Sequence, residues 1–214
     1  MIGCRILLYS AALAMTSLPL FALDRQQSNL VVSQLDGSQK SDDGRTLHPK
    51  KCSNGRRFGK YTGKQVIKYK SSEAVGTIII DTCNRVLYVV QSGGMAIAYG
   101  VGVGRRGFRW SGTAHIKRKA EWPAWHPPKE MIKRELRRYR RRLPDRMEGG
   151  PNNPLGARAL YLYQGETDTL YRIHGTNAPR SIGQAVSSGC VRLLNDEVID
   201  LYDRIQLGTK VIVF

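Results

Sequence analysis

Ser187-Ser188-Gly189-Cys190-Val191-Arg192 is the stretch that decides the fold and its chemistry, and Cys190 lies sixteen positions after His174. The small residues before Cys190 leave its thiol open to a carbonyl carbon, and backbone N–H groups near Gly189 can point at the oxyanion that forms when sulfur attacks. His174 supplies a base that can accept the thiol proton. The stretch therefore indicates an acyl-transfer centre with a cysteine nucleophile.

Both key residues also have ordinary structural interpretations. An unpaired cysteine is commonly a small buried hydrophobe, and a lone histidine is commonly a hydrogen-bonded ring in the core. Ser187-Ser188-Gly189 makes a poor core strand, however, and Arg192 favours an electropositive site that stabilises a thiolate. His174 follows the strand-like run 170–173 and opens a turn, a place where loops carry functional side chains. We therefore prefer the functional interpretation of both residues.

The chain resembles the L,D-transpeptidase catalytic domain of bacterial cell-wall enzymes. The motif of that family is a His-Gly segment followed about sixteen residues later by Ser-X-Gly-Cys-X-Arg or Asn, which matches His174-Gly175 and residues 187–192. The resemblance covers residues 66–214 and extends to the segments 77–82, 87–90, 99–104, 121–128 and 153–160. It implies a mainly β fold, an L,D-transpeptidase-like β-sandwich with a few short helices. An active-site lid is also implied, for which residues 122–150 are the candidate.

The resemblance further implies roles for the residues of the site. Cys190 is the expected nucleophile, His174 the base, and Gly175 the residue that orients the imidazole ring. Backbone N–H groups near Gly189 and Cys190 are expected to form the oxyanion hole. Arg192 has two open interpretations: a bidentate fork for a substrate carboxylate, or an internal salt bridge to one of two acidic residues, Asp196 and Glu197.

Two positions depart from the family pattern. Many members have a second histidine directly before the Gly-Cys pair, where this chain has Ser188. We expect this change to tune the pocket, because the nucleophile and the base are intact. Many members also have Thr-Pro-X-Gly where this chain has Trp110-Ser111-Gly112-Thr113, so a differently shaped turn is expected there.

The reaction implied by the resemblance acts on peptidoglycan stem peptides and uses no cofactor or metal. The thiolate of Cys190 attacks the carbonyl at the L-centre of the third residue of a stem tetrapeptide and expels the terminal D-alanine. The acyl group then passes to an amine, either of a neighbouring stem, which gives a 3–3 cross-link, or of an outer-membrane protein. With water as the acceptor, the same site is a carboxypeptidase and hence a hydrolase.

Other classes of function fit parts of the sequence. A non-catalytic basic envelope protein would bind peptidoglycan and use Cys190 only structurally, whereas a secreted cysteine peptidase would need a cleft for an L-peptide. Residues 102–107 satisfy the G-x-G-x-x-G pattern of dinucleotide-binding folds, but no helical repeat follows, so we predict a tight strand exit instead. A zinc site is unsupported because the histidines are scattered, at His48, His115, His126 and His174.

The N-terminus is typical of a secretory signal. Arg5 precedes the apolar stretch 6–21, and Ala22 precedes polar sequence. This apolar stretch is shorter than the roughly 20 residues of a membrane-spanning helix, so we expect cleavage near Ala22 and no permanent membrane anchor. The mature protein would then lie in the periplasm or cell envelope, with 23–65 as a flexible polar tether and 66–214 as the catalytic domain. In that compartment Cys52 and Cys83 either form a disulfide or both stay unpaired.

The formal net charge of +17 indicates a protein attracted to polyanions. Its densest basic run, 129–146, holds nine Lys and Arg residues but Tyr139 as its only aromatic residue. Because this run lacks a base-stacking pattern, we predict a solvated helix face and no specific nucleic-acid binding. For an exported protein, acidic peptidoglycan peptides and anionic envelope polymers are the expected partners.

Apolar runs separated by turn residues predict strands at 77–80, 86–90, 95–101, 160–163, 170–173 and 209–214. Helices are predicted at 128–142 and after Asn195, where apolar residues recur at helical spacing. Asn195 would cap the second helix and Gly208 would end it. Residues 122–128 hold three prolines and two tryptophans, which predicts a rigid aromatic wall that either lines the substrate or packs under a loop.

Overall fold

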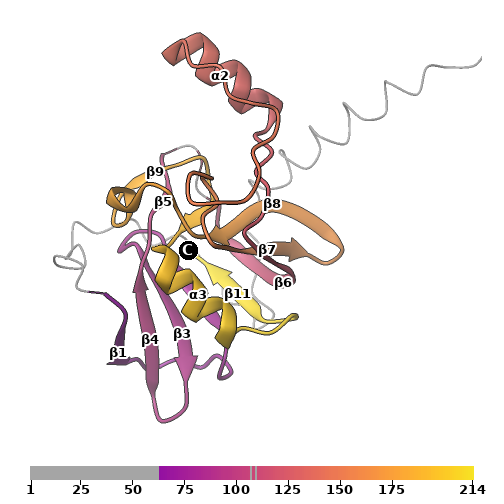
Figure 1. The fold of residues 1–214 in the computed structure, drawn as a ribbon. Helices are drawn as coiled ribbons and strands as arrows, with labels where there is room; N and C mark the ends of the chain where they lie inside the picture. The colour runs from indigo at the N-terminus through magenta and orange to yellow at the C-terminus, as the bar shows by residue number, and fades with distance from the viewer. Residues whose placement is uncertain (1–62, 107, 109) are drawn as a thin grey trace, which may run out of the picture. The chain divides into compact units, whose positions relative to one another are not determined.

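The computed structural model describes residues 63–106, 108 and 110–214, and Figure 1 shows its ribbon. The expected signal segment, 1–22, and the expected tether up to residue 62 lie outside the described residues, as does Cys52. Cys83 is disulfide-bonded, and Cys190 is a free thiol. In the described part of the chain, no helix is long and apolar enough to cross a membrane.

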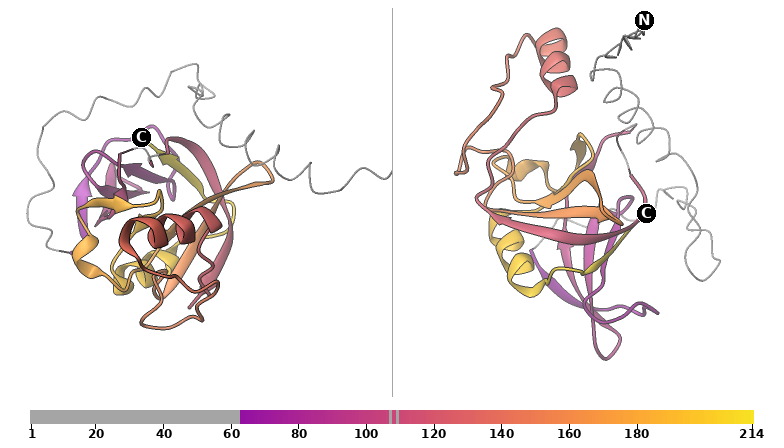
Figure 2. Two further views of the ribbon diagram at one scale, coloured as in Figure 1. Left: turned by 90° about the horizontal axis from the view of Figure 1, so that it is seen from above. Right: turned by 90° about the vertical axis from the view of Figure 1, so that its right-hand side faces the viewer.

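The large sheet has nine strands, and its order places the chain's last strand in the middle. From edge to edge the strands are β1 (Gln65–Lys68), β4 (Met95–Gly100), β3 (Val86–Gln91), β2 (Ile78–Asp81), β11 (Lys210–Val213), β6 (Gly112–Glu121), β7 (Arg158–Gln164), β8 (Thr167–His174) and β10 (Val191–Arg192). β11 is parallel to β2 and antiparallel to β6, so it joins the two halves of the sheet. These halves run in different directions (Figure 2), because neighbouring strands twist relative to one another. The predicted mainly β fold is confirmed.

A small second sheet lies against the β10 edge of the large one. β5 (Val103–Gly104) pairs in parallel with β9 (Ala185–Ser187), and a bridge between Gly102 and Arg192 connects β5 to β10. Among the described residues between β5 and β6, none is helical. The G-x-G-x-x-G segment therefore begins in a strand and lacks the helix N-terminus that holds a dinucleotide.

The core explains why the apolar runs become strands. β2 and β3 bury most of their side chains, and the register pairs Ile78 with Val89 and Ile80 with Leu87. Each fully buried side chain of this size contributes about 1.5–3 kcal/mol to folding. The helix α3 (Asn195–Arg204) adds Val198 and Leu201, both 0% exposed, to this core. Tyr99 of β4, which is fully buried, donates from its hydroxyl to Asp200 of α3 at 2.6 Å.

The two predicted helices form, but their ends differ from the prediction. α2 spans Lys129–Tyr139, and it stops there because Arg140 is left-handed, with φ 54°, and its N–H bonds to the carbonyls of Glu135 and Leu136. α3 ends at Arg204, ahead of Gly208. The prediction that Asn195 caps α3 is wrong: Leu194 is the cap residue and no side chain caps the helix. All six predicted strands overlap β2, β3, β4, β7, β8 or β11.

Residues 122–150, the lid candidate, lie within the connection between β6 and β7 and carry α2 (Figure 1). The base of this segment is closed by paired hydrogen bonds between the backbones of Trp125 and Met147, at 2.8 and 2.9 Å. Asn153, only 1% exposed, donates from Nδ2 to the carbonyls of Pro123, Met147 and Glu148, and its Oδ1 accepts from the N–H of Leu155. One buried amide thus ties both ends of the segment together.

We predict that Asn153→Ala destabilises the protein by about 2–4 kcal/mol, because it leaves several buried backbone groups without partners. The measurement is urea unfolding followed by circular dichroism. Asn177→Ala is a matched control, since Asn177 makes one exposed hydrogen bond, to the carbonyl of Asn152 at 2.8 Å, and should cost no more than about 0.5–1 kcal/mol. Equal losses of stability in both variants would contradict the role of Asn153 in joining the two ends of the segment 122–150.

Candidate active site

The parallel pairing of β8 with β10 brings the two sequence motifs together. Val191 pairs with Ile173, and Arg192 pairs with His174. Ile173 and Val191 are buried at 0% and 5% exposure on one face, so Arg192 and His174 share the other face. Cys190 directly precedes β10, two positions before Arg192, so the pairing brings the motif that carries the thiol to the strand that ends in His174.

Ser187 and Gly189 shape the turn that presents Cys190. The buried Ser187 hydroxyl donates to the carbonyl of Cys190 at 2.6 Å and accepts from the N–H of Gly189 at 3.1 Å. Gly189 has φ 119°, and a side chain there would overlap the ring of Tyr171. Tyr171 in turn stacks on Trp110, with ring centroids 5.4 Å apart. Trp110 belongs to the segment 110–113 that differs from the family pattern, so this segment supports the turn. Of the two predicted oxyanion donors, the N–H of Gly189 already donates to the Ser187 hydroxyl. The N–H of Cys190 has no hydrogen-bond partner among the described residues, so it is the donor that could bind an oxyanion.

His174 is buried, at 4% exposure, and its ring has a defined orientation. Nδ1 lies 2.6 Å from the carbonyl oxygen of Gly175. A carbonyl only accepts hydrogen bonds, so Nδ1 carries the proton and Nε2 keeps its lone pair. Burial lowers the pKa of His174 to about 3, and the positive charges of Arg192 and Arg172 act in the same direction, although nearby backbone carbonyls oppose them. The ring is thus a neutral base.

The thiol of Cys190 is also neutral at rest. Its pKa is raised above the ordinary value, mainly because surrounding protein atoms desolvate it, while Arg172 and Arg192 oppose the shift. The expected electropositive surroundings are present in Arg172 and Arg192, but burial outweighs these two cations in the resting site. Sγ lies 4.0 Å from the carbonyl oxygen of Leu170, and no hydrogen bond joins it to His174. Such catalytic contacts often tighten only when substrate binds.

A strained bend in β8 aims groups at the thiol. Leu170 has φ 60°, an unusual conformation for a bulky residue, and it is 71% exposed. The carboxylate of Asp168 accepts from the N–H of Leu170 and binds Arg172 through both of its oxygens, at 2.7 and 2.8 Å. Arg172 also lies over the ring of Tyr161. The bend places a backbone carbonyl and a paired guanidinium next to Cys190, which the sequence did not predict.

Asn195 holds the loop that carries Gly175. Its Oδ1 accepts from the N–H groups of Ala157, at 3.0 Å, and Thr176, at 3.1 Å. A side chain at either Gly156 or Gly175 would overlap this oxygen. Asn195 is thus a positioning residue for the His174 loop, and the sequence analysis missed it because an asparagine at this position also fits a helix cap.

The remaining candidates, Ser188 and Arg192, also lie at the turn. The hydroxyl of Ser188 accepts from Arg134 Nη2 of α2 at 3.1 Å. The Nε of Arg192 is buried without a hydrogen-bond partner among the described residues. Its role, as a fork for a substrate carboxylate or in a salt bridge to Asp196 or Glu197, stays a prediction. In the described ranges, no group of three or more His, Cys, Asp or Glu side chains could hold a metal ion.

Comparison with known proteins identifies the family. Residues 76–213 match the model of the YkuD family, the L,D-transpeptidase catalytic domain. The chain belongs to this family. The probable L,D-transpeptidase YbiS of Escherichia coli K12 is 37% identical over 139 residues, which are 63% of this chain and 43% of YbiS. The chain thus spans less than half the length of the curated relatives it matches.

Solved structures are also similar to this chain, among them the following two. The Ldtfm–avibactam carbamoyl enzyme has a TM-score of 0.50 at 16% identity, with 66% of this chain and 49% of that chain covered, which is a likeness of fold. A protein from Brucella melitensis, described as a probable carnitine operon oxidoreductase, is 45% identical. The match covers 78% of this chain and all of that one, with a TM-score of 0.48.

We predict that Cys190 reacts with iodoacetamide at a rate that keeps rising between about pH 6 and pH 9, because a raised thiol pKa leaves little thiolate at neutral pH. The rate is measured by intact-protein mass spectrometry, with Cys190→Ala as the control for labelling elsewhere. A plateau of fast reaction below neutral pH would instead indicate a preformed thiolate–imidazolium pair.

We predict that His174 makes the fold acid-sensitive. In the unfolded chain a histidine takes up a proton near pH ~6.5, whereas the folded site resists protonation until about pH 3. Stability is therefore full above the unfolded pKa and falls as the pH drops through this window, by up to about 1.4 kcal/mol per pH unit. In urea titrations, His174→Gln should lose stability less steeply over the same pH range. Parallel slopes for the two proteins would refute the prediction.

Proposed function

We propose that this chain is a cysteine-dependent peptidoglycan L,D-transpeptidase with Cys190 as nucleophile and His174 as general base. The observation that supports the proposal is the β8–β10 pairing, in which Arg192 is the partner of His174 and the free thiol of Cys190 directly precedes β10. The family match supports the reaction class. The substrate is proposed to be a stem tetrapeptide of the cell wall.

The acylation step begins with proton transfer. Nε2 of His174 accepts the thiol proton, while the Nδ1–H bond to the Gly175 carbonyl holds the ring and stabilises the imidazolium that forms. The thiolate attacks the carbonyl carbon at the L-centre of the third stem residue, and the oxyanion accepts a hydrogen bond from Cys190 N–H. When the C–N bond breaks, the imidazolium returns its proton to the departing amine of D-alanine, and a thioester remains.

The second step consumes the thioester. An acceptor amine gives its proton to His174 and attacks the thioester carbonyl, which expels the Cys190 sulfur and restores the thiol. The amine of a second stem peptide gives a 3–3 cross-link, that of an outer-membrane protein anchors the protein to the wall, and water makes the enzyme a carboxypeptidase. Each acceptor is compatible with the same two catalytic residues.

Electrostatics favours the negative charge that develops on sulfur and on the oxyanion, although the same cations disfavour the imidazolium. Arg192 and Arg172 both act on the thiol, and Arg192 also acts on His174. Their positive charges stabilise the thiolate and the oxyanion, whereas the neutral resting pair gains nothing from them. The expected export to the cell envelope would bring this site to its polymer.

We predict that the mature protein forms a stoichiometric covalent adduct with a carbapenem, and a thioester with a stem tetrapeptide, both detected by intact-protein mass spectrometry. Cys190→Ala should form neither while keeping the wild-type circular dichroism spectrum. His174→Gln should acylate about 10²–10⁴ times more slowly, the usual contribution of a general base. A folded wild-type protein without any adduct would favour the non-catalytic binding protein instead.

A further inference from the structure

Three arginines lie at or next to the turn 187–190. The backbone N–H of Arg105 donates to the carbonyl of Ser187 at 3.0 Å, Arg134 donates to the Ser188 hydroxyl at 3.1 Å, and Arg192 follows Cys190 by two positions. Five other arginines have acidic partners in the same structure: Arg141, Arg146, Arg158, Arg172 and Arg204. Asp168, which pairs with Arg172, is the carboxylate that acts on the Cys190 thiol, so cations outnumber carboxylates around the turn.

Arg134 is the member of this group that α2 brings from far away in the sequence. Its Nη2 binds Ser188, the residue that precedes Gly189-Cys190, across a separation of 54 positions. Its guanidinium lies 5.4 Å from the ring centroid of Phe108, and its Nε is buried without a hydrogen-bond partner. The Ser188 hydroxyl and the aromatic face thus hold the group in place while part of its donor capacity stays unused.

A second guanidinium group, that of Arg105, lies over the same Phe108 ring. Arg105 lies 4.6 Å from the Phe108 centroid, so one aromatic ring receives two guanidinium groups. Two like charges brought to one ring repel each other, and a carboxylate that binds both relieves that repulsion through charge-assisted hydrogen bonds. The nearest acid on α2, Glu135, is instead paired with Arg141.

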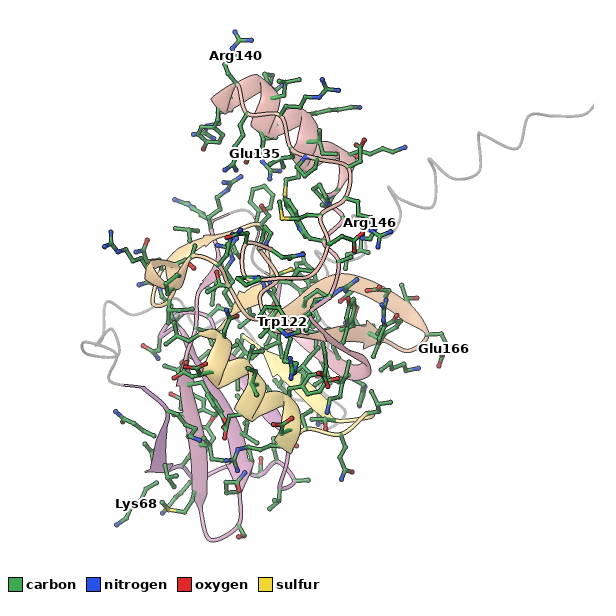
Figure 3. All side chains as sticks on the ribbon, viewed as in Figure 1. Lys68, Trp122, Glu135, Arg140, Arg146 and Glu166 are labelled. Atoms are coloured by element: carbon green, nitrogen blue, oxygen red, sulfur yellow. The ribbon has the colours of Figure 1, made fainter. Side chains whose placement is uncertain are left out.

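Arg134 differs in exposure from the other basic residues near it on α2. Lys133, Arg137 and Arg138 are exposed, whereas Arg134 is half-buried. Figure 3 shows Arg140 at the free end of α2 and Arg146 on the segment that returns toward β7. Within the strongly basic run 129–146, Arg134 is therefore the side chain that contacts the turn before Cys190.

We propose that Arg134, together with Arg105 across the Phe108 ring, binds a carboxylate of the acyl-donor peptide and so determines which donors acylate Cys190. Ser188, at the position where many relatives have a histidine, accepts a hydrogen bond from Arg134 and orients its fork toward that carboxylate. This inference rests on the proposed function, because the ligand is the donor of the same reaction. Arg134 is a specificity-determining residue and takes no part in proton transfer.

The test measures kcat/KM for thioester formation with three tetrapeptide donors: one with free carboxylates, one with an amidated C-terminus and one with an amidated diamino-acid carboxylate. Arg134→Ala should lower kcat/KM for the free donor by about 10- to 100-fold, the usual effect of losing a charge-assisted hydrogen-bond pair. For one of the amidated donors the wild type should already show that loss, and Arg134→Ala should add less than about twofold, because the same contact cannot be lost twice.

The controls separate this role from a structural one. Arg137→Ala removes an equal charge from the exposed face of the same helix and should leave all three rates within about twofold, as surface charges usually do. Arg134→Lys should recover only part of the loss, because an ammonium lacks the planar fork. The rate of iodoacetamide alkylation at Cys190 should be unchanged in Arg134→Ala, which shows that the thiol and its turn are intact.

Equal losses with all three donors, or the same loss in Arg137→Ala, would overturn the inference and leave the proposed function standing. An alkylation rate that changes along with acylation would also overturn it, because Arg134 would then only hold the turn. A wild-type protein that none of the donors acylates would overturn both the inference and the proposed function.

Discussion

The two-residue parallel pairing of β10 with β8 is the constraint on which the site depends. Two ladder pairs are too few to fix a strand by themselves, and the structure adds bonds on every side. Gly102 and Arg192 exchange two backbone hydrogen bonds, at 2.8 and 2.9 Å, and the N–H of Leu193 donates to the carbonyl of His174. Ser187 closes the turn before β10. The register that aligns Arg192 with His174 is thus also held by Gly102, Leu193 and Ser187, whose side chains or backbones take no part in the proposed proton transfer.

Burial sets the protonation state that this geometry presents. Desolvation raises the thiol pKa and lowers the imidazole pKa, so both groups are neutral before substrate binds. A neutral pair is easier to bury than an ion pair, because neither member needs a compensating charge. The cations near the site therefore have their main effect after the proton moves, when negative charge develops on sulfur and then on the oxyanion. Cys190 and His174 are thus neutral in the resting protein, and the nearby cations act on the negative charge that forms during the reaction.

The sequence predicted what depends on local pattern. Apolar runs bounded by turn residues located the central strands, and the spacing of His174 and Cys190 identified the segments that meet. It did not predict β1, β9 and β10, because two to four residues carry too little pattern. β6 was also missed, since its sequence Gly112–Glu121 is largely polar and charged. The role of Asn195 was misassigned because its oxygen can satisfy either helix N–H groups or distant loop N–H groups, and only tertiary structure decides between them.

The contact between Arg134 and Ser188 also joins residues far apart in the sequence, so tertiary structure alone reveals it. It affects which cations a bound carboxylate would contact. A stem tetrapeptide carries more than one carboxylate. A carboxylate placed against Arg192 would offset the positive charge that favours the thiolate, and would so raise the thiol pKa further. A carboxylate held by Arg134 and Arg105, over Phe108, contacts cations other than Arg172 and Arg192, the two that lower the thiol pKa most. Binding the donor through α2 therefore leaves Arg192 free to stabilise the charge that develops during attack, so recognition and catalysis use different guanidinium groups.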